Sequence, residues 1–419
     1  MQKYDIAVIG AGASGLAAAV AAARAGAAVL VLEKNHVPGR KILSTGSGKC
    51  NFSNSAVTPA AYHPGPASFL KRTFAALPPR EVPAFFEELG LLWTADARGR
   101  LFPNSFRAQD VSGVLLNELG SRGVELRTLT EVSAVTPGKE GFTLEAFRVP
   151  PQWDKKSARG ERLQFSAGRV ILAAGGAAYP QIGGTGGGYA LLRALGHKIS
   201  ALSPAIVPLT SGDASLKELD GVRTEAVLTL RAGGKALAAA AGELLFTSYG
   251  VSGPAVLDLS RAALAALGKS DVFIEADFFP SLKPDALRRL LETRAERFAA
   301  RPFGHFACGL LNEKLLKAAA ARCGIVWAAP AGPGLPEFAG VLKGFSVGIT
   351  GSRGFEDAMV TAGGCSLAEL DPQTFASKKV PGLYVTGELL DLDGDSGGYN
   401  LHLAWTSGIL AGRAAAKKK

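Results

Sequence analysis

The sequence predicts an α/β protein whose main domain is assembled from two separated stretches of chain. The chain opens with a short apolar strand at Tyr4–Ile9, an alanine-rich helix at Ser14–Ala25 and a second strand at Ala28–Leu32, and this order is typical of a β-α-β unit. Strands and glycine turns of the same style return at Phe345 and lead to a closing helix at Tyr399–Ala416. These observations predict one discontinuous Rossmann-like domain with a large insertion.

The insertion differs in character from the chain on either side of it. Its first part has short strand-like runs at Ala226–Arg231, Glu243–Phe246 and Val272–Asp277, which favour a small antiparallel sheet or barrel. Its second part has helical patterns at Pro284–Ala300 and Leu310–Arg322. We therefore predict three domains: a discontinuous Rossmann-like domain of residues 1–195 and 345–419, a β-barrel-like domain of residues 196–280, and a small helical domain of residues 281–344.

Composition and cysteine content narrow the class of protein. Of the 419 residues, 47% are hydrophobic and 20% are charged, as in an ordinary soluble globular protein. The four cysteines form no C-x-x-C pair and no metal-ligand spacing, so we expect neither a dithiol reductase nor a metal site and predict a reducing, cytoplasmic location. The uncharged stretch Ile6–Ala23 resembles the apolar part of a signal peptide, but a nucleotide-binding fingerprint explains it better, and no other stretch resembles a membrane span.

A glycine fingerprint joins the first strand to the first helix. Gly10 permits the tight turn, Gly12 lets the backbone approach a pyrophosphate, and Gly15 lets helix and strand pack closely. The helix N-terminus then presents free N–H groups and the positive end of its dipole to the phosphates. Glu33 ends the second strand, where a carboxylate can accept hydrogen bonds from both ribose hydroxyls. This context favours a dinucleotide site over a glycine-rich turn without a ligand.

The rest of the chain favours FAD over NAD as the dinucleotide. A plain NAD domain needs neither Arg40 and Lys41, which could contact phosphates, nor the glycine loop at Ser44–Asn51, nor the C-terminal return. In that return, a strand ends at Gly387-Glu388, which suits a carboxylate reaching the ribityl chain. Asp395–Asn400 then opens the closing helix, whose N–H groups could face the flavin pyrimidine edge and stabilise negative charge on the reduced ring. The alternative for Arg40 and Lys41 is that they are solvated surface charges. The alternative for Asp395–Asn400 is an ordinary N-capped helix.

These segments also carry a family resemblance that extends over essentially the whole chain. The sequence resembles the BaiN/YhiN-like family of bacterial FAD-dependent flavoproteins (NAD(P)/FAD-dependent, aminoacetone oxidase-like) through Gly39–Lys41 with Ser44–Asn51, Leu245–Thr247 with Gly250–Pro254, Thr361–Gly364 and Gly387–Asn400. The resemblance implies a two-dinucleotide-binding-type (Rossmann-like) FAD domain with an inserted β-barrel and a small helical domain.

Carried over by motif, the resemblance implies FAD-binding residues from both stretches of the domain. They are Gly10, Gly12, Ala13, Ser14, Gly15, Glu33, Lys34, Arg40, Lys41, Val132, Gly387, Glu388, Gly397, Gly398, Tyr399, Asn400 and Leu401. Relatives commonly have Arg where this chain has Lys49, and Gln where it has His402. What the resemblance implies about the substrate is therefore weaker at those two positions.

Three residues are candidates for a proton donor. Cys50 lies in the glycine loop expected beside the isoalloxazine ring, and Lys49 could lower its pKa. It could then protonate a substrate carbon after hydride transfer, although a packed thiol that shapes the loop is the favoured alternative. His402 and Tyr399 are weaker candidates.

No second nucleotide fingerprint is present in the sequence. The glycine loop at Gly183–Gly188 lacks both the spacing and the following acid. If NAD(P)H reduces the flavin, we expect it to visit the substrate side transiently. Otherwise the electrons come from the substrate and pass to oxygen or another acceptor.

The resemblance offers several activities for an FAD-dependent oxidoreductase. The specific prediction is reduction of a uridine in ribosomal RNA to dihydrouridine, in which flavin N5 delivers hydride to C6 and an acid protonates C5. Such a base must leave its stack, which makes unpaired RNA the expected target. The alternatives are a small-molecule enone reductase, an amine oxidase, and a non-catalytic flavin-bound RNA-binding factor.

The placement of charge favours RNA among these. The net charge is +10, and residues 281–325 contain nine Lys and Arg against four Asp and Glu. Two basic clusters are predicted to contact RNA phosphates. They are Arg294, Arg297 and Arg301, which would share one helical face, and Lys155, Lys156, Arg159 and Arg162. Solvated surfaces are the alternative interpretation of both clusters.

Overall fold

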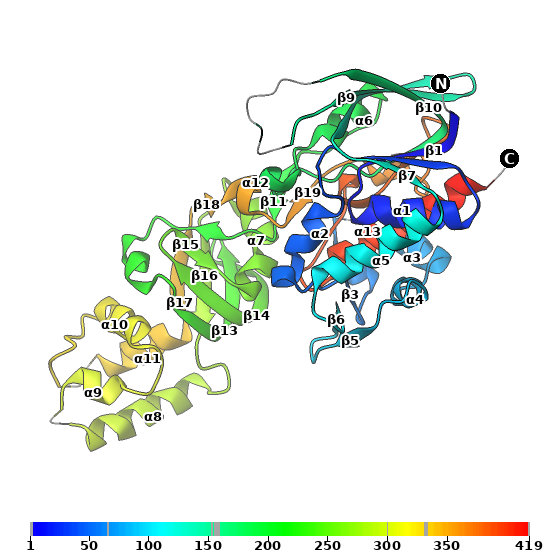
Figure 1. Cartoon of the computed structure of the whole chain (residues 1–419). Coiled ribbons are helices and arrows are strands. Elements are labelled where there is room, and N and C mark those ends of the chain that lie inside the picture. The colour runs from blue at the N-terminus through cyan, green and yellow to red at the C-terminus, as the bar shows by residue number, and fades with distance from the viewer. Residues whose placement is uncertain are drawn as a thin grey trace. The chain divides into compact units, whose positions relative to one another are not determined.

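The computed structural model describes residues 3–64, 67–151, 154, 160–299, 301–330 and 334–417. They form two compact units, one made of Met1–Ser203 and Met359–Lys419 and the other of Pro204–Ala358. In Figure 1 the first unit holds both ends of the chain, coloured blue and red. The chain crosses from one unit to the other near β11 (Ser203–Ala205) and again near β19 (Val360–Ala362).

A parallel sheet forms the centre of the first unit. Its strands run in the order β7 (Glu125–Arg127), β2 (Val29–Leu32), β1 (Lys3–Ile9), β10 (Arg162–Leu172) and β20 (Leu383–Val385). All of β2 and the second half of β1 are buried, because parallel strands are covered on both faces. The C-terminal strand β20 pairs with the end of β10. The two stretches of chain therefore build one Rossmann-type sheet, and the predicted fold class is confirmed.

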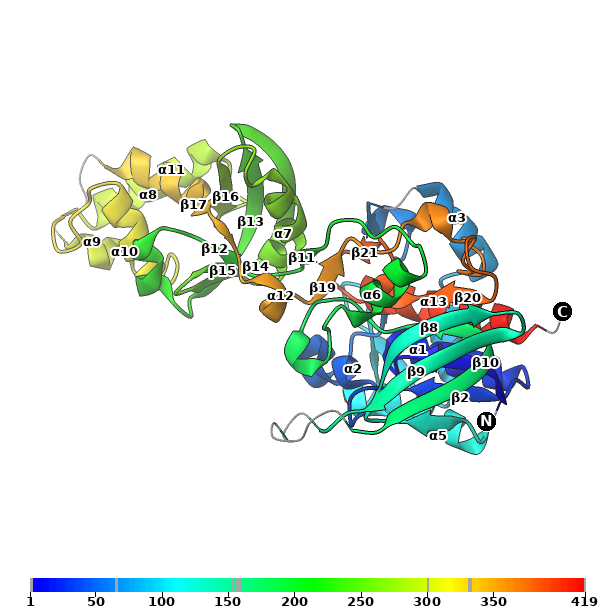
Figure 2. The same ribbon diagram turned by 90° about the horizontal axis from the view of Figure 1, so that it is seen from above.

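Two antiparallel strands extend this sheet. β9 (Gly141–Arg148) pairs with the first half of β10, and β8 (Thr130–Gly138) pairs with β9, as Figure 2 shows. Three members of the second predicted basic cluster, Lys155, Lys156 and Arg159, lie outside the described residues. The fourth, Arg162, begins β10 and lies 3.4 Å from the Glu145 carboxylate.

Helices from opposite ends of the chain pack together beside the sheet. α1 (Ala13–Arg24) follows the first strand, α13 (Tyr399–Ala416) closes the chain, and α5 (Ala108–Ser121) also packs against α1; all three lie on the same side of the sheet in Figure 1. A Cβ atom at Gly408 would lie 2.2 Å from the Ser14 carbonyl oxygen. One at Gly412 would lie 2.3 Å from the Ala18 carbonyl oxygen. Glycine at these positions lets the two backbones approach closely.

Shorter elements surround the sheet of the first unit. They are α2 (Arg40–Ser44), α3 (Ala67–Ala76), α4 (Glu81–Glu88), α6 (Gly187–Ala194), β3 (Ser53–Asn54), β4 (Tyr62–His63), β5 (Trp93–Ala95), β6 (Arg100–Pro103) and β21 (Asp393–Gly394). β3, β6 and β5 form one small sheet, and β21 pairs with β4. None of the helices in the described ranges has both the length and the apolar character needed to cross a membrane.

The second unit contains a closed antiparallel sheet. Its strand order is β17 (Phe345–Ile349), β16 (Val272–Asp277), β13 (Arg223–Ala232), β14 (Lys235–Thr247), β15 (Gly250–Ser252), β12 (Leu209–Thr210) and β18 (Gly351–Ser352). Only Thr350 separates β17 from β18, so one segment of chain pairs at both ends of the order. The sheet therefore curls into a barrel. Burial alternates along β13, which places every second side chain in the barrel core.

Helices complete the second unit and share its core. They are α7 (Pro254–Ala266), α8 (Pro284–Arg297), α9 (Phe303–Ala307), α10 (Glu313–Arg322), α11 (Leu335–Lys343) and α12 (Gly354–Asp357). Phe303 packs edge-on against Phe338, with ring centroids 5.1 Å apart, and both belong to the same hydrophobic cluster as the barrel strands.

The unit boundaries differ from those expected from the sequence. The insertion spans Pro204–Ala358 rather than residues 196–344, and its barrel and helices form one unit. Phe345–Ile349 belongs to the barrel because it pairs with β16. Ser200 belongs to the first unit, where its backbone N–H donates to the Gly364 carbonyl.

Candidate functional site

The glycine fingerprint forms a tight turn between β1 and α1. Gly10 has a φ of +101°, and a Cβ atom there would lie 2.5 Å from the Ala173 carbonyl oxygen. A Cβ at Gly15 would lie 1.9 Å from the Gly10 carbonyl oxygen. A Cβ at Gly12 would meet nothing within 4 Å. The protein's own packing therefore requires glycine at the first and third positions, whereas the second opens a space that a pyrophosphate fits.

The N-terminus of α1 faces this space with unsatisfied donors. Gly12 is the N-cap residue and supplies no side-chain cap, and the first turn has no acidic residue. Ala13 and Ser14 begin the helix. The first N–H groups of a helix lack intrahelical partners and favour an anion, so this end of α1 fits the phosphates of a dinucleotide.

Glu33 lies at the end of β2, where its carboxylate is held by backbone donors. It is 7% exposed. One carboxylate oxygen accepts the N–H of Ala11 at 2.7 Å, and the other accepts the N–H of Asn35 at 2.7 Å. These bonds fix the carboxylate beside the fingerprint, and its remaining lone pairs can accept ribose hydroxyls.

A second glycine loop meets the same edge of the sheet. The Lys34 ammonium donates to the Thr185 hydroxyl at 2.6 Å, and burial lowers the pKa of Lys34. A Cβ at Gly183 would lie 2.6 Å from the side-chain nitrogen of Asn35. The loop at Gly183–Gly188 therefore belongs to the site, although its spacing alone gave no such signal.

Val132 lies beyond this edge, on β8. A hollow of about 570 Å³ lies between β8 and α6, and its lining includes Val132, Gly187, Ala190 and Leu191. The strand register shifts between Val132 and Ala134.

Arg40 and Lys41 begin α2, which follows β2 and Glu33 in the chain. Gly39 has a φ of +71°, and its N–H donates to the Ala11 carbonyl at 2.7 Å. The Lys41 ammonium lies 2.6 Å from a Glu388 carboxylate oxygen. The other Glu388 oxygen accepts the N–H of Thr361 at 2.9 Å. Lys41 is thus engaged by a carboxylate from the C-terminal return.

The C-terminal return reaches the first turn of α1. Gly387 has a φ of +67°, and a Cβ there would lie 2.4 Å from the Ser14 hydroxyl oxygen. Its N–H donates to the Ser407 hydroxyl at 3.0 Å. Ser14 and Gly387, which are 373 positions apart and which the sequence assigns to one site, therefore lie together.

The N-terminus of α13 is built from two glycines with positive φ. Gly397 and Gly398 have φ values of +106° and +100°, and a Cβ at Gly398 would lie 2.4 Å from the Ser53 carbonyl oxygen. The Asn400 amide bonds both the N–H and the carbonyl of Gly394. The N-cap residue Gly398 supplies no side-chain cap, so the first turn of the helix presents N–H groups that a ligand can accept.

Cys50 is a buried thiol in a strained part of the glycine loop. It has a φ of +55°, which is uncommon for a residue other than glycine. Burial raises the pKa of Cys50 to about 12. The expectation that Lys49 lowers this pKa is wrong, because the loop buries the thiol whereas the Lys49 ammonium lies 5.9 Å from the Phe106 ring centroid.

The two other proton-donor candidates lie on α13. His402 is fully buried, with Nδ1 2.8 Å from the Ser53 hydroxyl, and burial lowers its pKa to about 3. The ring is therefore neutral at physiological pH. The Tyr399 carbonyl accepts the Tyr62 hydroxyl at 3.1 Å, and the two rings meet at right angles, with centroids 6.2 Å apart.

Two residues that the sequence did not single out support the site. The Thr361 hydroxyl accepts the N–H of Ala177 at 2.8 Å, which ties the turn after β10 to the C-terminal return. The Asn54 amide donates to the Gly397 carbonyl at 2.9 Å. Thr361 belongs to a motif that was noted, but nothing in the sequence distinguishes Asn54 from other loop asparagines.

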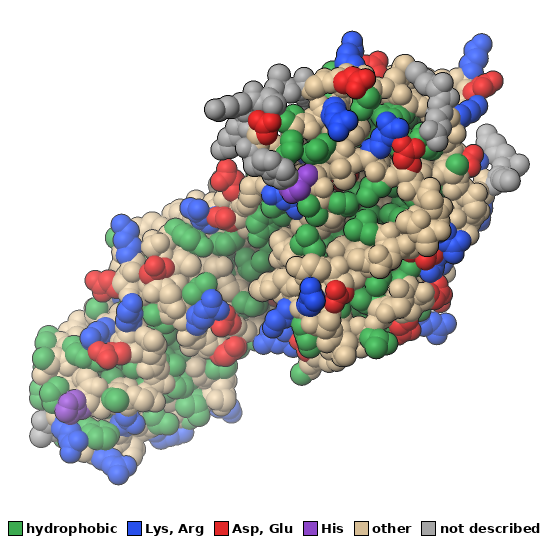
Figure 3. All heavy atoms as spheres, viewed as in Figure 1, with side chains coloured by type: hydrophobic (Ala, Val, Ile, Leu, Met, Phe, Trp, Pro, Cys, Tyr) green, Lys and Arg blue, Asp and Glu red, His purple; other side chains and the backbone are tan. Residues whose placement is uncertain are grey.

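The basic cluster in the helical region does not have the geometry that the sequence suggested. α8 ends at Arg297, so Arg301 lies beyond it. The Arg294 guanidinium is turned inward and donates to the carbonyls of Phe306 and Cys308. Residues 204–358 contain 17 Lys and Arg against 16 Asp and Glu, and Figure 3 shows both signs interspersed on the visible face of this unit. The remaining chain carries 29 against 20, which is most of the excess positive charge.

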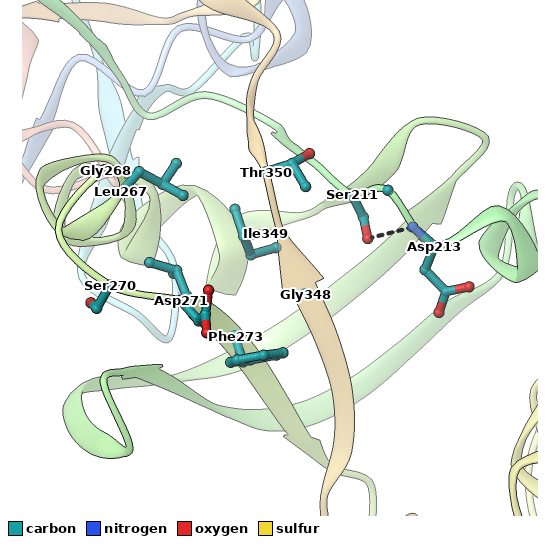
Figure 4. A pocket seen from close by; sticks show the side chains of 12 residues that line it. Ser211, Asp213, Leu267, Gly268, Ser270, Asp271, Phe273, Gly348, Ile349 and Thr350 are labelled. Carbon is teal, nitrogen blue, oxygen red and sulfur yellow. Dashed lines mark hydrogen bonds between the residues drawn. The ribbon is translucent and has the colours of Figure 1, made fainter.

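A hollow of about 760 Å³ lies in the second unit (Figure 4). Its lining includes the hydroxyls of Ser211 and Thr350, the ring of Phe273 and the carboxylates of Asp213 and Asp271. Asp213 is paired with Arg322 at 3.0 Å. The site residues predicted from the sequence all lie in the first unit, and none of them lines this hollow.

Comparisons with known proteins match nearly the whole chain. The family described as the HI0933-like protein Rossmann domain matches residues 4–414. A 3-dehydro-bile acid delta(4,6)-reductase of Clostridium scindens is 36% identical, over 99% of both chains. A ribosomal RNA dihydrouridine synthase of Escherichia coli is 28% identical, over 97% of this chain and 96% of that protein. A ribosomal RNA dihydrouridine synthase of Haemophilus influenzae is 29% identical, over 96% and 95%.

Solved structures share the fold at lower sequence identity. A 3-ketosteroid delta1-dehydrogenase from Sterolibacterium denitrificans superposes with a TM-score of 0.54 at 14% identity, over 99% of this chain and all of that one. A 3-ketosteroid-delta4-(5alpha)-dehydrogenase from Rhodococcus jostii gives a TM-score of 0.50 at 17% identity, over 99% and 97%.

Proposed function

The chain belongs to the HI0933-like Rossmann family as an FAD-dependent oxidoreductase, and from this membership we propose that it reduces a carbon–carbon double bond conjugated to a carbonyl group. The specific substrate that we propose is a uridine in ribosomal RNA, which becomes dihydrouridine. NAD(P)H is proposed as the transient reductant.

One observation carries the reaction class: the names of the curated relatives describe the same bond chemistry. One relative is a bile-acid delta(4,6)-reductase and two are dihydrouridine synthases. In uridine the C5–C6 double bond is conjugated to the C4 carbonyl, as an enone double bond is to its ketone. In both substrates hydride adds to the carbon farther from the carbonyl and a proton adds to the nearer one.

The residues of the candidate site fit FAD, which supplies the hydride for such reductions when bound. The open space at Gly12 and the N-terminus of α1 would hold the pyrophosphate, and Glu33 would hold a ribose. The uncapped N-terminus of α13 would hold the polar edge of the ring through N–H groups near Tyr399.

Charge supports RNA as the substrate. The first unit carries a net +9 by residue count, whereas residues 204–358 carry +1. A polyanion would therefore be attracted mainly to the unit that holds the candidate site. RNA contact through the helical region of the insertion, as expected from the sequence, has less support because the charge of that unit is nearly balanced.

A small steroid-like enone is the second candidate substrate. It is favoured by the higher identity, 36%, to the bile-acid reductase. Such a substrate shares the conjugated bond but needs no polyanion-binding surface.

Flavin reoxidation separates these candidates. The purified enzyme is reduced anaerobically with NADPH and mixed either with a ribosomal RNA transcript or with a 3-oxo-Δ4,6 steroid acid. We expect the transcript to restore the oxidised flavin spectrum and to contain dihydrouridine by mass spectrometry. Reoxidation by the steroid alone would replace RNA with a small enone, and RNA binding without reoxidation would indicate a non-catalytic binding factor.

A further inference from the structure

Phe106 exposes its aromatic ring on the surface of the first unit, near the glycine loop Ser44–Asn51. Phe106 is 47% exposed and has a φ of +51°. An L-residue pays conformational energy in this left-handed region, and an exposed ring recovers little of it through burial. Backbone outliers of this kind cluster at functional sites.

The ring is held by the loop that contains Cys50. Phe106 packs against Phe102, with ring centroids 5.8 Å apart and an interplanar angle of 39°. A Cβ at Gly46 would lie 3.6 Å from the Phe102 ring. The Lys49 ammonium lies 5.9 Å from the Phe106 centroid. The rings of Phe102 and Phe106, called the aromatic platform below, therefore pack beside the glycine loop Ser44–Asn51.

The platform also borders the N-terminus of α13. The Arg100 guanidinium lies 5.7 Å from the Phe102 centroid, and a Cβ at Gly397 would lie 3.9 Å from Cγ of Arg100. Gly397 directly precedes the helix end that fits the flavin ring. A ligand on Phe106 would thus lie beside the candidate site rather than at a remote surface.

Lys49, whose ammonium lies over the Phe106 ring, and Arg107, which directly follows Phe106 in the chain, lack acidic partners among the described residues. Lys49 and Arg107 are exposed, and neither forms an ion pair with any other described residue. Arg100 differs, because it pairs with Asp96 at 2.6 Å. An exposed aromatic face flanked by unpaired cations is the arrangement used to bind single-stranded nucleic acid.

We infer that Phe106, Lys49 and Arg107 bind an unpaired nucleotide next to the target uridine. The base of that nucleotide stacks on Phe106, and its flanking phosphates contact Lys49 and Arg107. This inference rests on the proposed RNA substrate and adds the residues that hold the strand while the target base enters the site.

The test compares Phe106→Ala with a matched exposed phenylalanine, Phe273→Ala, in the other unit. Phe273 is 40% exposed and lines the hollow in Figure 4. Binding of a fluorescein-labelled, uridine-rich single-stranded RNA is measured by anisotropy. We expect Phe106→Ala to weaken binding about 5- to 100-fold, Phe106→Trp to restore it, and Phe273→Ala to leave it unchanged. Equal effects of the two alanine variants would overturn the inference.

Stability and salt dependence separate recognition from folding. Phe106→Gly relieves the left-handed strain, so we expect an unchanged or higher unfolding midpoint together with weaker RNA binding. Loss of stability in parallel with affinity would assign the ring a structural role. The double variant Lys49→Gln, Arg107→Gln should reduce the slope of log Kd against log salt by about 1.4, or about 0.7 for each lost phosphate contact; an unchanged slope would remove these cations from the interface.

The outcomes also distinguish this inference from the proposed function. If the wild-type enzyme forms dihydrouridine and Phe106→Ala does so with unchanged RNA affinity, the platform is wrong and the function stands. If the wild-type enzyme neither binds nor modifies RNA, both are wrong.

Discussion

Glu33 combines two tasks, because it caps backbone donors of the folded chain and faces the candidate ribose position. Glu33→Ala removes the acceptor for the N–H groups of Ala11 and Asn35 as well as for the ribose. We expect FAD binding to weaken by about 1–3 kcal/mol, measured by titrating the apoprotein with FAD. Glu33→Gln is the control, since it keeps one acceptor oxygen and should lose less. Equal FAD affinity in Glu33→Ala would exclude the ribose contact.

His402 gives the fold a dependence on acid pH. Its pKa is about 3 in the folded chain, against 6.5 for the free residue. Between these values the unfolded chain binds a proton that the folded chain does not, so stability present above pH 6.5 is lost as the pH falls towards 3. The slope from this one residue is about 1.4 kcal/mol per pH unit.

We expect His402→Gln to flatten this part of the profile. The free energy of unfolding is measured by urea denaturation across acid pH. His305→Gln changes an exposed histidine of α9 and serves as the control. Identical profiles for the wild type and His402→Gln would contradict the burial of a neutral imidazole.

Cys50 is expected to shape its loop rather than to donate a proton. The thiol is fully buried, and its raised pKa of about 12 makes it a weak acid at neutral pH. Turnover of Cys50→Ala should therefore stay within about threefold of the wild type, while its unfolding midpoint falls because a buried atom is lost. A hundredfold slower product formation with normal flavin reduction would instead identify Cys50 as the donor.

At the scale of elements, the close contact of α1 and α13 joins the two stretches of chain that form the first unit, which holds the candidate FAD site. Gly408→Ala would place a Cβ 2.2 Å from the Ser14 carbonyl oxygen. We expect a loss of about 1–3 kcal/mol in unfolding free energy, because the helices must move apart. Gly113→Ala in α5 is the matched control, since a Cβ there meets nothing within 4 Å; it should be neutral or stabilise by up to about 1 kcal/mol. Similar changes in both variants would argue against tight helix packing.

The sequence predicted those elements whose signal is local. The strand, glycine turn and helix around Gly10–Gly15 follow from spacing and apolar runs alone. The partner of a strand is not local information: Phe345–Ile349 reads as a strand, but only its pairing with β16 shows that it belongs to the barrel. The ion pair of Lys41 with Glu388 likewise joins residues far apart in the chain. From the sequence alone, Arg294 is interpreted as a surface cation. Its bonds to the Phe306 and Cys308 carbonyls depend on how the chain turns after α8, and that turn is not local information.

At the scale of the molecule, the FAD unit carries both the cofactor cradle and most of the excess charge. The insertion separates the two stretches of this unit in sequence, yet β20 rejoins β10 and α13 rejoins α1. Its barrel is joined by one segment of chain, which contributes β17 at one end of the strand order and β18 at the other. The candidate site residues therefore all lie in the first unit, and none of them lines the hollow of the second unit (Figure 4).

The most direct test of the central claim is the dihydrouridine content of ribosomal RNA from a strain that lacks this protein. RNA from the parent strain, the deletion strain and the deletion strain with the chain restored is digested and quantified by mass spectrometry. We expect a ribosomal dihydrouridine to disappear on deletion and to return when the chain is restored. Full ribosomal dihydrouridine content in the deletion strain would contradict the RNA assignment and leave a small enone as the substrate.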